Sequence, residues 1–413
     1  MALETRDKTK VDSYLDSFII KYESEDLGSR ACVAIDDTIM QRGHKAAAGS
    51  SILKDFVSPI DATVVTKIET AGIRIAGRTR MDEFGISGLF GEPGNYSGAV
   101  GAVAGGLADY ALVNDYTGAI GGQAAAAGLC CIRPTYGTVS RYGLIPAVAS
   151  MDQIGIVART PDVGFSLLKI IAGHDEKDGA MLPHKDENSA MTNDRAWDNG
   201  VGACSSGDNA LLLNGVNSSN LRIGAPINLL PEGNNHATAE VAGEFGNCSA
   251  LVEFELMFPD VYSQVMQILC CAEFGSNISR YDGIKFGYRA EGYANLHELY
   301  TKSRTEAFGT DTKLAALVGA MVLSRNNYTR YYDKAMRIRR LIMSSLDWSV
   351  YDAVLLAANA GHYTDNQKLG FRALPRLCGF PAVTFRYRGM EAMLVAGPGK
   401  EDVLSALLRE VGI

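Results

Sequence analysis

Residues 91–141 have the sequence GEPGNYSGAVGAVAGGLADYALVNDYTGAIGGQAAAAGLCCIRPTYGTVSR, and this Gly/Ala-rich stretch decides the fold. Glycine lets two main chains approach closely and leaves backbone N–H groups unhindered. A tight catalytic loop needs both properties, because its N–H groups stabilise the negative charge that develops in a transition state. The alternative is a close-packed helix and loop that performs no chemistry. Chemistry of this kind also needs a nucleophile and a base to activate it.

The flanking sequence alternates between helical patterns and short apolar runs. We expect helices at residues 11–21, 99–112, 162–172, 262–280, 311–345 and 401–411, and a helix followed by a strand within 61–77. Further strands are expected at 31–35, at LRIGAPI (221–227), at YDAVLLAAN (351–359) and at PAVTFRYR (381–388). This alternation predicts α/β layering.

Two segments depart from that pattern. Residues 1–30 are expected to form a short N-terminal helical segment before an α/β domain that spans 31–413. Residues 184–220 are rich in Asn, Ser, Gly and Asp, which predicts an exposed insertion that projects from the surface.

Composition excludes several classes of protein. The chain has 413 residues, of which 47% are hydrophobic, and its net charge is −8. An acidic balance argues against direct nucleic-acid binding. The basic stretch at 334–340 follows a helical pattern, and such runs are mostly solvated faces. No run approaches the roughly 20 apolar residues that cross a bilayer, so no membrane span is expected.

The eight cysteines and six histidines show no metal-ligand spacing, so neither a metal nor a cofactor is expected. Two vicinal cysteine pairs lie in apolar runs and are interpreted as reduced core thiols. The first residues lack the apolar core of a secretory signal. These features favour an intracellular protein, located in the cytoplasm or the mitochondrial matrix.

Several segments resemble the amidase-signature family, and within it the A subunits of glutamyl-tRNA(Gln) amidotransferases. They are AGRTRMDEFGISG (76–88), AVGAVAGGLADYALVND (99–115), RPTYGTVSRYGLIPAVASMDQIGIVART (133–160), SNLRIGAP (219–226), AEFGSNISRYDGIKFGYR (272–289), TRYYDKAMRIRRLI (329–342) and CGFPAV (378–383). The resemblance covers most of the chain in the family's order. It implies a single domain with a central mixed β-sheet flanked by helices on both faces.

The resemblance also implies a Ser–Ser–Lys triad, in which a neutral lysine and a bridging serine activate a nucleophilic serine. By motif, the lysine falls on Asp36, the bridging serine on Asn95 and the nucleophile on Ala119. A carboxylate, an amide and a methyl group cannot perform these roles. The resemblance therefore predicts that all three catalytic positions are vacated.

The family's substrate-binding groups are replaced as well. Gly118 remains from the family's oxyanion glycines, but Thr117 stands where another glycine is expected. Paired arginines that hold a substrate carboxylate correspond to Leu314 and Ala315. Asp36 and Asp37 are interpreted as a loop pair that accepts backbone N–H groups.

These features predict a catalytically inactive homologue of the A subunit, which serves as a scaffolding component of a multi-protein complex. Its partners would then be other protein subunits, and a small-molecule substrate is not expected. Two alternatives stay open: an active amidohydrolase or glutamine amidotransferase with rearranged residues, and a small-molecule sensor. The rearranged site would have to use Ser97, Thr117 or Lys45, which lie near the vacated positions in sequence.

Overall fold

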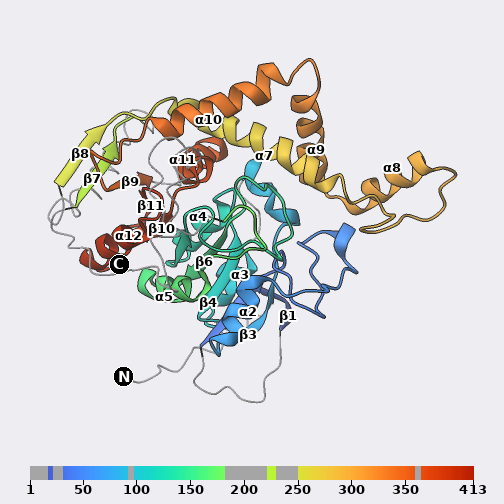
Figure 1. The fold of residues 1–413 in the computed structure, drawn as a ribbon, viewed down its shortest axis with the longest axis horizontal. Helices are drawn as coiled ribbons and strands as arrows, with labels where there is room; N and C mark the ends of the chain where they lie inside the picture. The colour runs from blue at the N-terminus through green and yellow to red at the C-terminus, as the bar shows by residue number, and fades with distance from the viewer. Residues whose placement is uncertain (1–16, 22–30, 92–96, 182–220, 229–249, 359–363) are drawn as a thin grey trace, which may run out of the picture.

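A computed structural model describes residues 17–21, 31–91, 97–181, 221–228, 250–358 and 364–413. Within these residues eleven strands form one sheet in the order β1-β3-β2-β4-β6-β5-β10-β11-β9-β7-β8 (Figure 1). The strands are β1 (Phe18–Lys21), β2 (Cys32–Asp36), β3 (Arg74–Thr79), β4 (Tyr110–Asn114), β5 (Cys130–Arg133), β6 (Ile154–Ala158), β7 (Arg222–Pro226), β8 (Ala250–Phe254), β9 (Ala353–Ala358), β10 (Ala382–Tyr387) and β11 (Met390–Ala396).

The sheet is mixed, as predicted. β2 runs parallel to both β3 and β4, and β7 runs parallel to both β8 and β9. The other neighbouring pairs are antiparallel. Because β2 and β4 are parallel, their carboxyl ends lie at the same edge of the sheet, and the chain segments that follow them meet there.

Helices cover both faces of the sheet, which confirms the predicted α/β class (Figure 1). On β4, Leu112 packs against one face cluster, whereas Ala111 and Val113 pack against the opposite one, as strand alternation requires. One face is covered by α2 (Thr63–Thr70), α5 (Pro161–Ile171) and α12 (Glu401–Glu410). The other is covered by α3 (Gly98–Ala104), α4 (Ala119–Ala126), α7 (Tyr262–Ile278) and α11 (Asp365–Cys378).

The third quarter of the described chain is helical, as predicted. It contains α7, α8 (Leu296–Ala307), α9 (Thr310–Leu323), the π-helical turn η7 (Thr329–Asp333) and α10 (Lys334–Ser344). Figure 1 shows α8 extending away from the body of the molecule, while α9 and α10 meet at a corner. Short 3₁₀ turns complete the elements: η2 (Ser51–Leu53), η3 (Glu83–Gly85), η4 (Ser87–Leu89) and η6 (Pro259–Val261).

One continuous helix over residues 311–345 was a wrong prediction, because the chain breaks between α9 and α10. Ser324 Oγ and Asn327 Nδ2 both donate to the carbonyl oxygen of Met321, at 2.7 and 3.1 Å. Polar side chains that capture a terminal carbonyl in this way end a helix despite continuous apolar spacing around them.

The helix predicted for residues 11–21 is wrong where the structure describes it. Residues 18–21 form β1, which pairs antiparallel with β3 at the edge of the sheet. Phe18 is buried and Ile19 is exposed, so the segment alternates as a half-buried strand does. Pairing with β3, which lies more than fifty residues away, overrides the local helical pattern.

The helix predicted for residues 99–112 is correct only in its first half. α3 ends at Ala104, and the chain then turns and enters β4 at Tyr110. Small apolar residues suit a close-packed helix and a buried strand equally, so their composition gave no boundary.

Other predictions are confirmed or lie outside the described residues. The strands expected near residues 31–35 and 221–227 correspond to β2 and β7, and the last expected helix corresponds to α12. The insertion expected at 184–220 and most of the 1–30 segment lie outside the described residues. Among the described helices, none combines the length and the apolar character that crossing a bilayer requires.

Candidate functional site

Asp36 ends β2 and is buried, with 1% of its surface exposed. Its Oδ1 accepts hydrogen bonds from Thr38 N at 3.1 Å and from Thr38 Oγ1 at 3.3 Å, and Oδ2 accepts from Asn114 N at 3.4 Å. Burial raises the pKa of this carboxyl to about 7, and the neighbouring charge of Asp37 also raises it. The position thus holds an acid that joins the ends of β2 and β4, where the resemblance expects the neutral amine of a lysine.

Asp37, the next residue, is held by a different set of donors. Its Oδ2 accepts from the backbone N–H groups of Ala47 at 3.1 Å and Gly49 at 3.2 Å, and Arg78 forms a buried ion pair with it at 3.2 Å. The prediction that both aspartates accept backbone N–H groups is confirmed, although Asp36 is the last residue of β2 and not part of a loop.

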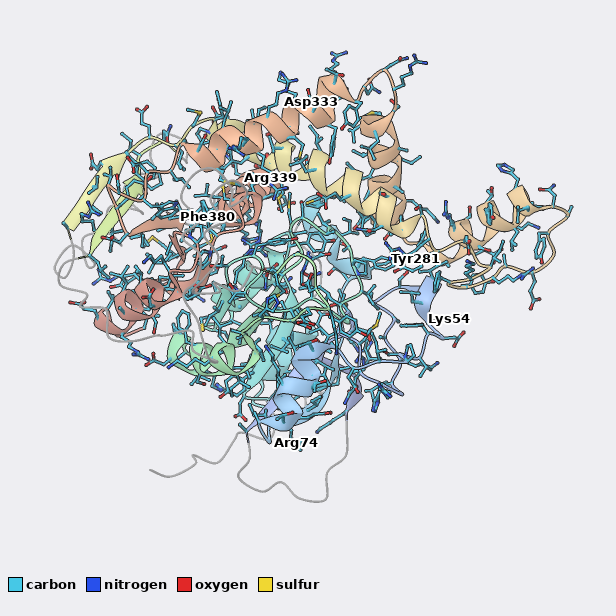
Figure 2. The ribbon with its side chains drawn as sticks, viewed as in Figure 1. Lys54, Arg74, Tyr281, Asp333, Arg339 and Phe380 are labelled. Atoms are coloured by element: carbon cyan, nitrogen blue, oxygen red, sulfur yellow. The ribbon has the colours of Figure 1, made fainter. Side chains whose placement is uncertain are left out.

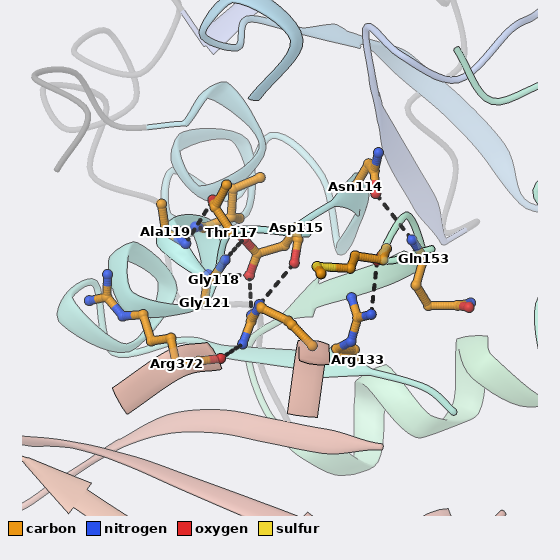
Figure 3. A network of polar contacts seen from close by, with 12 residues as sticks. Asn114, Asp115, Thr117, Gly118, Ala119, Gly121, Arg133, Gln153 and Arg372 are labelled. Carbon is orange, nitrogen blue, oxygen red and sulfur yellow. Dashed lines mark hydrogen bonds and ion pairs between the residues drawn. The ribbon is translucent and has the colours of Figure 1, made fainter. Parts of the chain in front are cut away.

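Ala119 is the first residue of α4, and Gly118 before it has the positive φ of 91° that ends the β4–α4 turn. The N-terminus of a helix normally attracts an anion, because its first N–H groups lack partners. Here the carboxylate of Asp115 takes that place (Figure 3). It accepts from Gly118 N at 2.9 Å, from Ile120 N at 3.2 Å and from Gly121 N at 2.9 Å.

Arg376 on α11 completes this arrangement. Its Nη2 donates to Asp115 Oδ2 at 2.8 Å, and its Nε donates to the Asp115 carbonyl at 3.1 Å. Both side chains of this ion pair are buried. The N–H groups at the start of α4 are thus committed to an internal carboxylate that has its own cation.

The turn η4 lies directly against the start of α4. A Cβ atom at Gly88 would lie 2.9 Å from Cβ of Ala119 and 2.5 Å from Oγ1 of Thr117. Ala119 and Thr117 are consequently only 5% and 4% exposed. A substrate could approach this position only if the turn moved.

Of the three positions at which the resemblance places the triad, the structure brings two to the β4–α4 turn. Asp36 contacts the last residue of β4, and Ala119 starts the helix that follows β4. Asn95 lies outside the described residues. Both described positions thus flank the β4–α4 turn, at the edge of the sheet where β2 and β4 end.

The three residues proposed for a rearranged site have other roles. Ser97 caps α3, with its Oγ accepting from Ala99 N at 3.3 Å, and its N–H donates to Gln123 Oε1 at 2.7 Å. Lys45 is exposed and pairs with Asp55 at 3.3 Å. Thr117 is buried under η4, with its Oγ1 3.4 Å from Ala119 N.

The positions expected for a carboxylate clamp carry no guanidinium group: Leu314 is exposed on α9, and Ala315 is buried. The sequence motifs did not indicate two arginines on α11, Arg372 and Arg376. Both lie against Gly118, which precedes α4, and Arg372 also lies against Gly122 within it. Arg372 forms a bidentate buried pair with Glu391, at 2.8 and 2.7 Å. The i, i+4 spacing of two arginines within the otherwise apolar run 369–378 was the available signal.

A second group of buried polar side chains lies beside the turn. Arg133 donates from Nη2 to the Met151 carbonyl at 2.9 Å, while its Nε and Nη1 have no partner among the described residues. Burial, together with the charge of Arg376, lowers the pKa of Arg133 to about 9. Figure 3 shows Arg133 near Gln153, whose N–H donates to Asn114 Oδ1 at 3.2 Å.

A pocket lies beside these groups, and one of its lining residues, Asp152, accepts a hydrogen bond from Asn114 Nδ2 at 2.9 Å. It is lined by Arg141, Tyr142, Leu144, Pro146, Ala149, Asp152, Lys177 and Asp178. Arg141 pairs with Asp178 at 3.1 Å, and Lys177 lies over the Tyr142 ring, so these charged groups already have partners. In the part of the chain that the structure describes, no cluster of three metal-ligating side chains occurs.

Comparisons with known proteins agree with this fold. The family model described as Amidase matches residues 32–91 and 93–370. The A subunit of glutamyl-tRNA(Gln) amidotransferase from Lachnoclostridium phytofermentans is 36% identical over 339 residues, which is 76% of this chain and 64% of that relative. The corresponding protein of Acinetobacter baumannii is 34% identical over 356 residues, covering 80% of this chain and 68% of the relative. The chain thus spans about two thirds of the length of these relatives.

The crystal structure of the glutamyl-tRNA(Gln) amidotransferase A subunit from Thermotoga maritima is similar to this chain in fold. The two superpose with a TM-score of 0.70 at 22% identity, over 97% of this chain and 88% of the other. The match extends across both the sheet and the helical third quarter.

Proposed function

The chain belongs to the amidase family, and we propose that it is a catalytically inactive homologue of the glutamyl-tRNA(Gln) amidotransferase A subunit that serves as a structural component of a multi-protein complex. One observation carries the proposal. The helix that should begin with a nucleophile begins with Ala119. The N–H groups at its start, which have no partner within the helix, donate to the chain's own Asp115.

Acyl transfer needs a nucleophilic oxygen, a base within hydrogen-bond reach and donors aimed at the developing oxyanion. Ala119 provides no oxygen, and Asp36 is a buried carboxyl instead of an amine. Two N–H donors at the start of α4 already bind one carboxylate oxygen. Each requirement fails at a different residue, so restoring one group does not restore the site.

The scaffolding role rests on what the chain retains. Its fold matches that of an amidotransferase A subunit over 97% of the chain, while Asp36 and Ala119 stand at positions that the resemblance assigns to reactive groups. Side chains that fill a core are kept when shape is useful, whereas groups that act only in chemistry are not needed for it. We infer that its partners are other protein subunits and not nucleic acid.

The compartment is also part of this proposal. Six cysteines among the described residues are free, and five of them are buried. Free buried thiols persist in a reducing compartment, which favours the cytoplasm or the mitochondrial matrix. Chemical labelling of thiols in the protein, unfolded directly after isolation from cells, would measure how many of its cysteines are reduced.

The test is an assay of ammonia release from glutamine, asparagine and simple amides, in which a catalytically active amidase is the positive control. We expect no turnover by the wild type. We also expect none by Ala119→Ser, because the restored hydroxyl still lacks a base. The alternative function, an active amidase with rearranged residues, predicts wild-type turnover that Thr117→Val abolishes. That result would overturn the proposal.

A further inference from the structure

An exposed apolar stripe runs along α9 to the corner where α9 meets α10. Leu314, Leu317 and Met321 are spaced i, i+3 and i+7, so they share one side of α9. All three are exposed, and Leu317 is 70% exposed. Tyr328, beyond the end of α9, is exposed as well. The opposite side of α9 is buried, with Ala315, Gly319 and Val322 packed inward.

Positive charge gathers at the end of this stripe that meets α10. Between positions 313 and 345 the sequence contains seven basic residues and one acidic residue, although the whole chain has a net charge of −8. Arg325, Arg330 and Lys334 are exposed around the turn. Asp333, the one acid between positions 313 and 345, pairs with Arg337 at 2.8 Å. Figure 2 shows Asp333 at the start of α10, beside this corner.

The corner is a fixed surface and not a loose loop. Asn327 binds the last turn of α9 through the Met321 carbonyl at 3.1 Å. The Tyr328 ring contacts the Tyr332 ring at 5.2 Å between centroids, and Arg339 ties α10 to α11 by donating to the Leu377 carbonyl at 2.6 Å. A surface already ordered loses little entropy when a partner binds it.

We propose that this α9–α10 corner (Leu314, Leu317, Met321, Arg325, Tyr328, Arg330 and Lys334) binds an acidic amphipathic helix of a partner protein. The inference rests on the proposed scaffolding function and names the surface that would carry it. The apolar stripe matches the apolar side of a helix laid along α9. The surrounding basic side chains match acidic residues on that helix's flanks.

Two other occupants fit the corner less well. A second copy bound symmetrically would place like charges against each other, which is unfavourable. A nucleic acid would use the basic groups but would leave the row of leucine and methionine side chains largely unmatched. The combination of apolar spacing and positive charge therefore favours an acidic helix.

The first experiment uses the full chain and a defined probe. A labelled peptide of Leu and Glu at helical spacing, about 20 residues long, is titrated in fluorescence anisotropy. A shuffled peptide of the same composition is the comparison, and single-stranded RNA is the competitor. We expect the patterned peptide to bind at least ten-fold more tightly than the shuffled one. We also expect binding to weaken when salt shortens the Debye length from about 10 Å.

Variants then locate the surface. Leu317→Glu and the pair Arg330→Glu with Lys334→Glu should each weaken peptide binding at least ten-fold, because one removes apolar contact and the other reverses charge. The matched controls are Val350→Glu, an exposed apolar residue, and Lys285→Glu, an exposed base, both away from the corner. Unchanged thermal midpoints show that every variant is folded.

Co-purification from the native cells separates failure of this inference from failure of the proposed function. Partner proteins that are lost with Leu317→Glu but kept with Val350→Glu support the corner. A stable complex that both variants retain would sustain the scaffolding function and overturn this docking surface. A chain that is always monomeric would overturn both, and RNA that displaces the peptide would overturn the acidic-helix partner.

Discussion

Gly122 lies where α4 meets α11, and no side chain fits at that point. A Cβ atom there would overlap the guanidinium group of Arg372. That group cannot move aside easily, because it forms a buried bidentate pair with Glu391. We therefore expect Gly122→Ala to lower the free energy of unfolding by about 2 kcal/mol, although alanine normally favours a helix over glycine. Urea unfolding followed by circular dichroism measures the change.

Gly179→Ala is the matched control, because Gly179 has open space around its Cα. We expect its free energy of unfolding to change by less than about 0.5 kcal/mol, as for most surface substitutions. Equal stability of the Gly122 and Gly179 variants would mean that the Arg372 side chain shifts without a measurable loss of stability. The close contact between α4 and α11 would then contribute nothing to the free energy of unfolding.

Single residues of the candidate site differ in how well the sequence alone could place them. Asp36, Gly118 and Ala119 lie in motifs whose neighbours in sequence mark their place, so they could be assigned before the structure. Arg376 could not be assigned, because its partner Asp115 is 261 positions away. Only the folded sheet brings β4 and α11 together.

Helix α4 depends on a buried ion pair at its N-terminus. Asp115 Oδ1 accepts backbone N–H groups, and Oδ2 accepts both Gly121 N and Arg376 Nη2. An amide in place of the carboxylate would point a donor at another donor and leave the charge of Arg376 buried without a partner. Asp115→Asn should therefore lower the free energy of unfolding by about 3 kcal/mol or more.

The comparison is a second Asp–Arg pair on the surface. Asp162 and Arg409 form an ion pair in which both side chains are 54% exposed. Exposed pairs contribute little, so Asp162→Asn should cost less than about 1 kcal/mol. Denaturant unfolding of both variants under one buffer tests this. Similar losses for the two would contradict the role assigned to Asp115.

Helices with one apolar side were predictable, and strands inside small-residue runs were not. α5 and α12 show apolar residues at helical spacing and lie where expected. α4 consists mostly of small residues, and β4 has the short mixed sequence YALVN. Their boundaries depend on the Asp115 turn and on the pairing of β4 with β2 and β6. Local composition cannot contain that information.

Across the whole molecule, carboxyl groups whose pKa is raised and those whose pKa is lowered respond to pH in opposite ways. Burial raises the pKa of Asp36 to about 7 and raises those of Asp82, Asp152 and Glu401 as well. Asp178 is among the acids whose pKa is lowered despite partial burial, because Arg141 donates hydrogen bonds to it. Lowered groups lose their stabilising effect only below their ordinary pKa, so measurements above pH 5 isolate the raised ones.

Between pH 5 and 8 the folded protein binds more protons than the unfolded chain at each raised carboxyl. The free energy of unfolding must then fall as pH rises through this window. Asp36 alone can account for up to about 3 kcal/mol, because each pKa unit corresponds to about 1.4 kcal/mol. We expect a lower thermal midpoint at pH 8 than at pH 5. Asp36→Asn should reduce the difference, since an amide does not ionise.

The control for this last comparison is Asp55→Asn, at a side chain that is 77% exposed. Its difference between pH 5 and pH 8 should equal that of the wild type. If Asp36→Asn also keeps the full difference, the carboxyl of Asp36 is ionised throughout the window. Asp36 would then be a permanently charged group at the β2–β4 edge, held by Thr38 and Asn114, and the pH dependence would arise from the other buried acids.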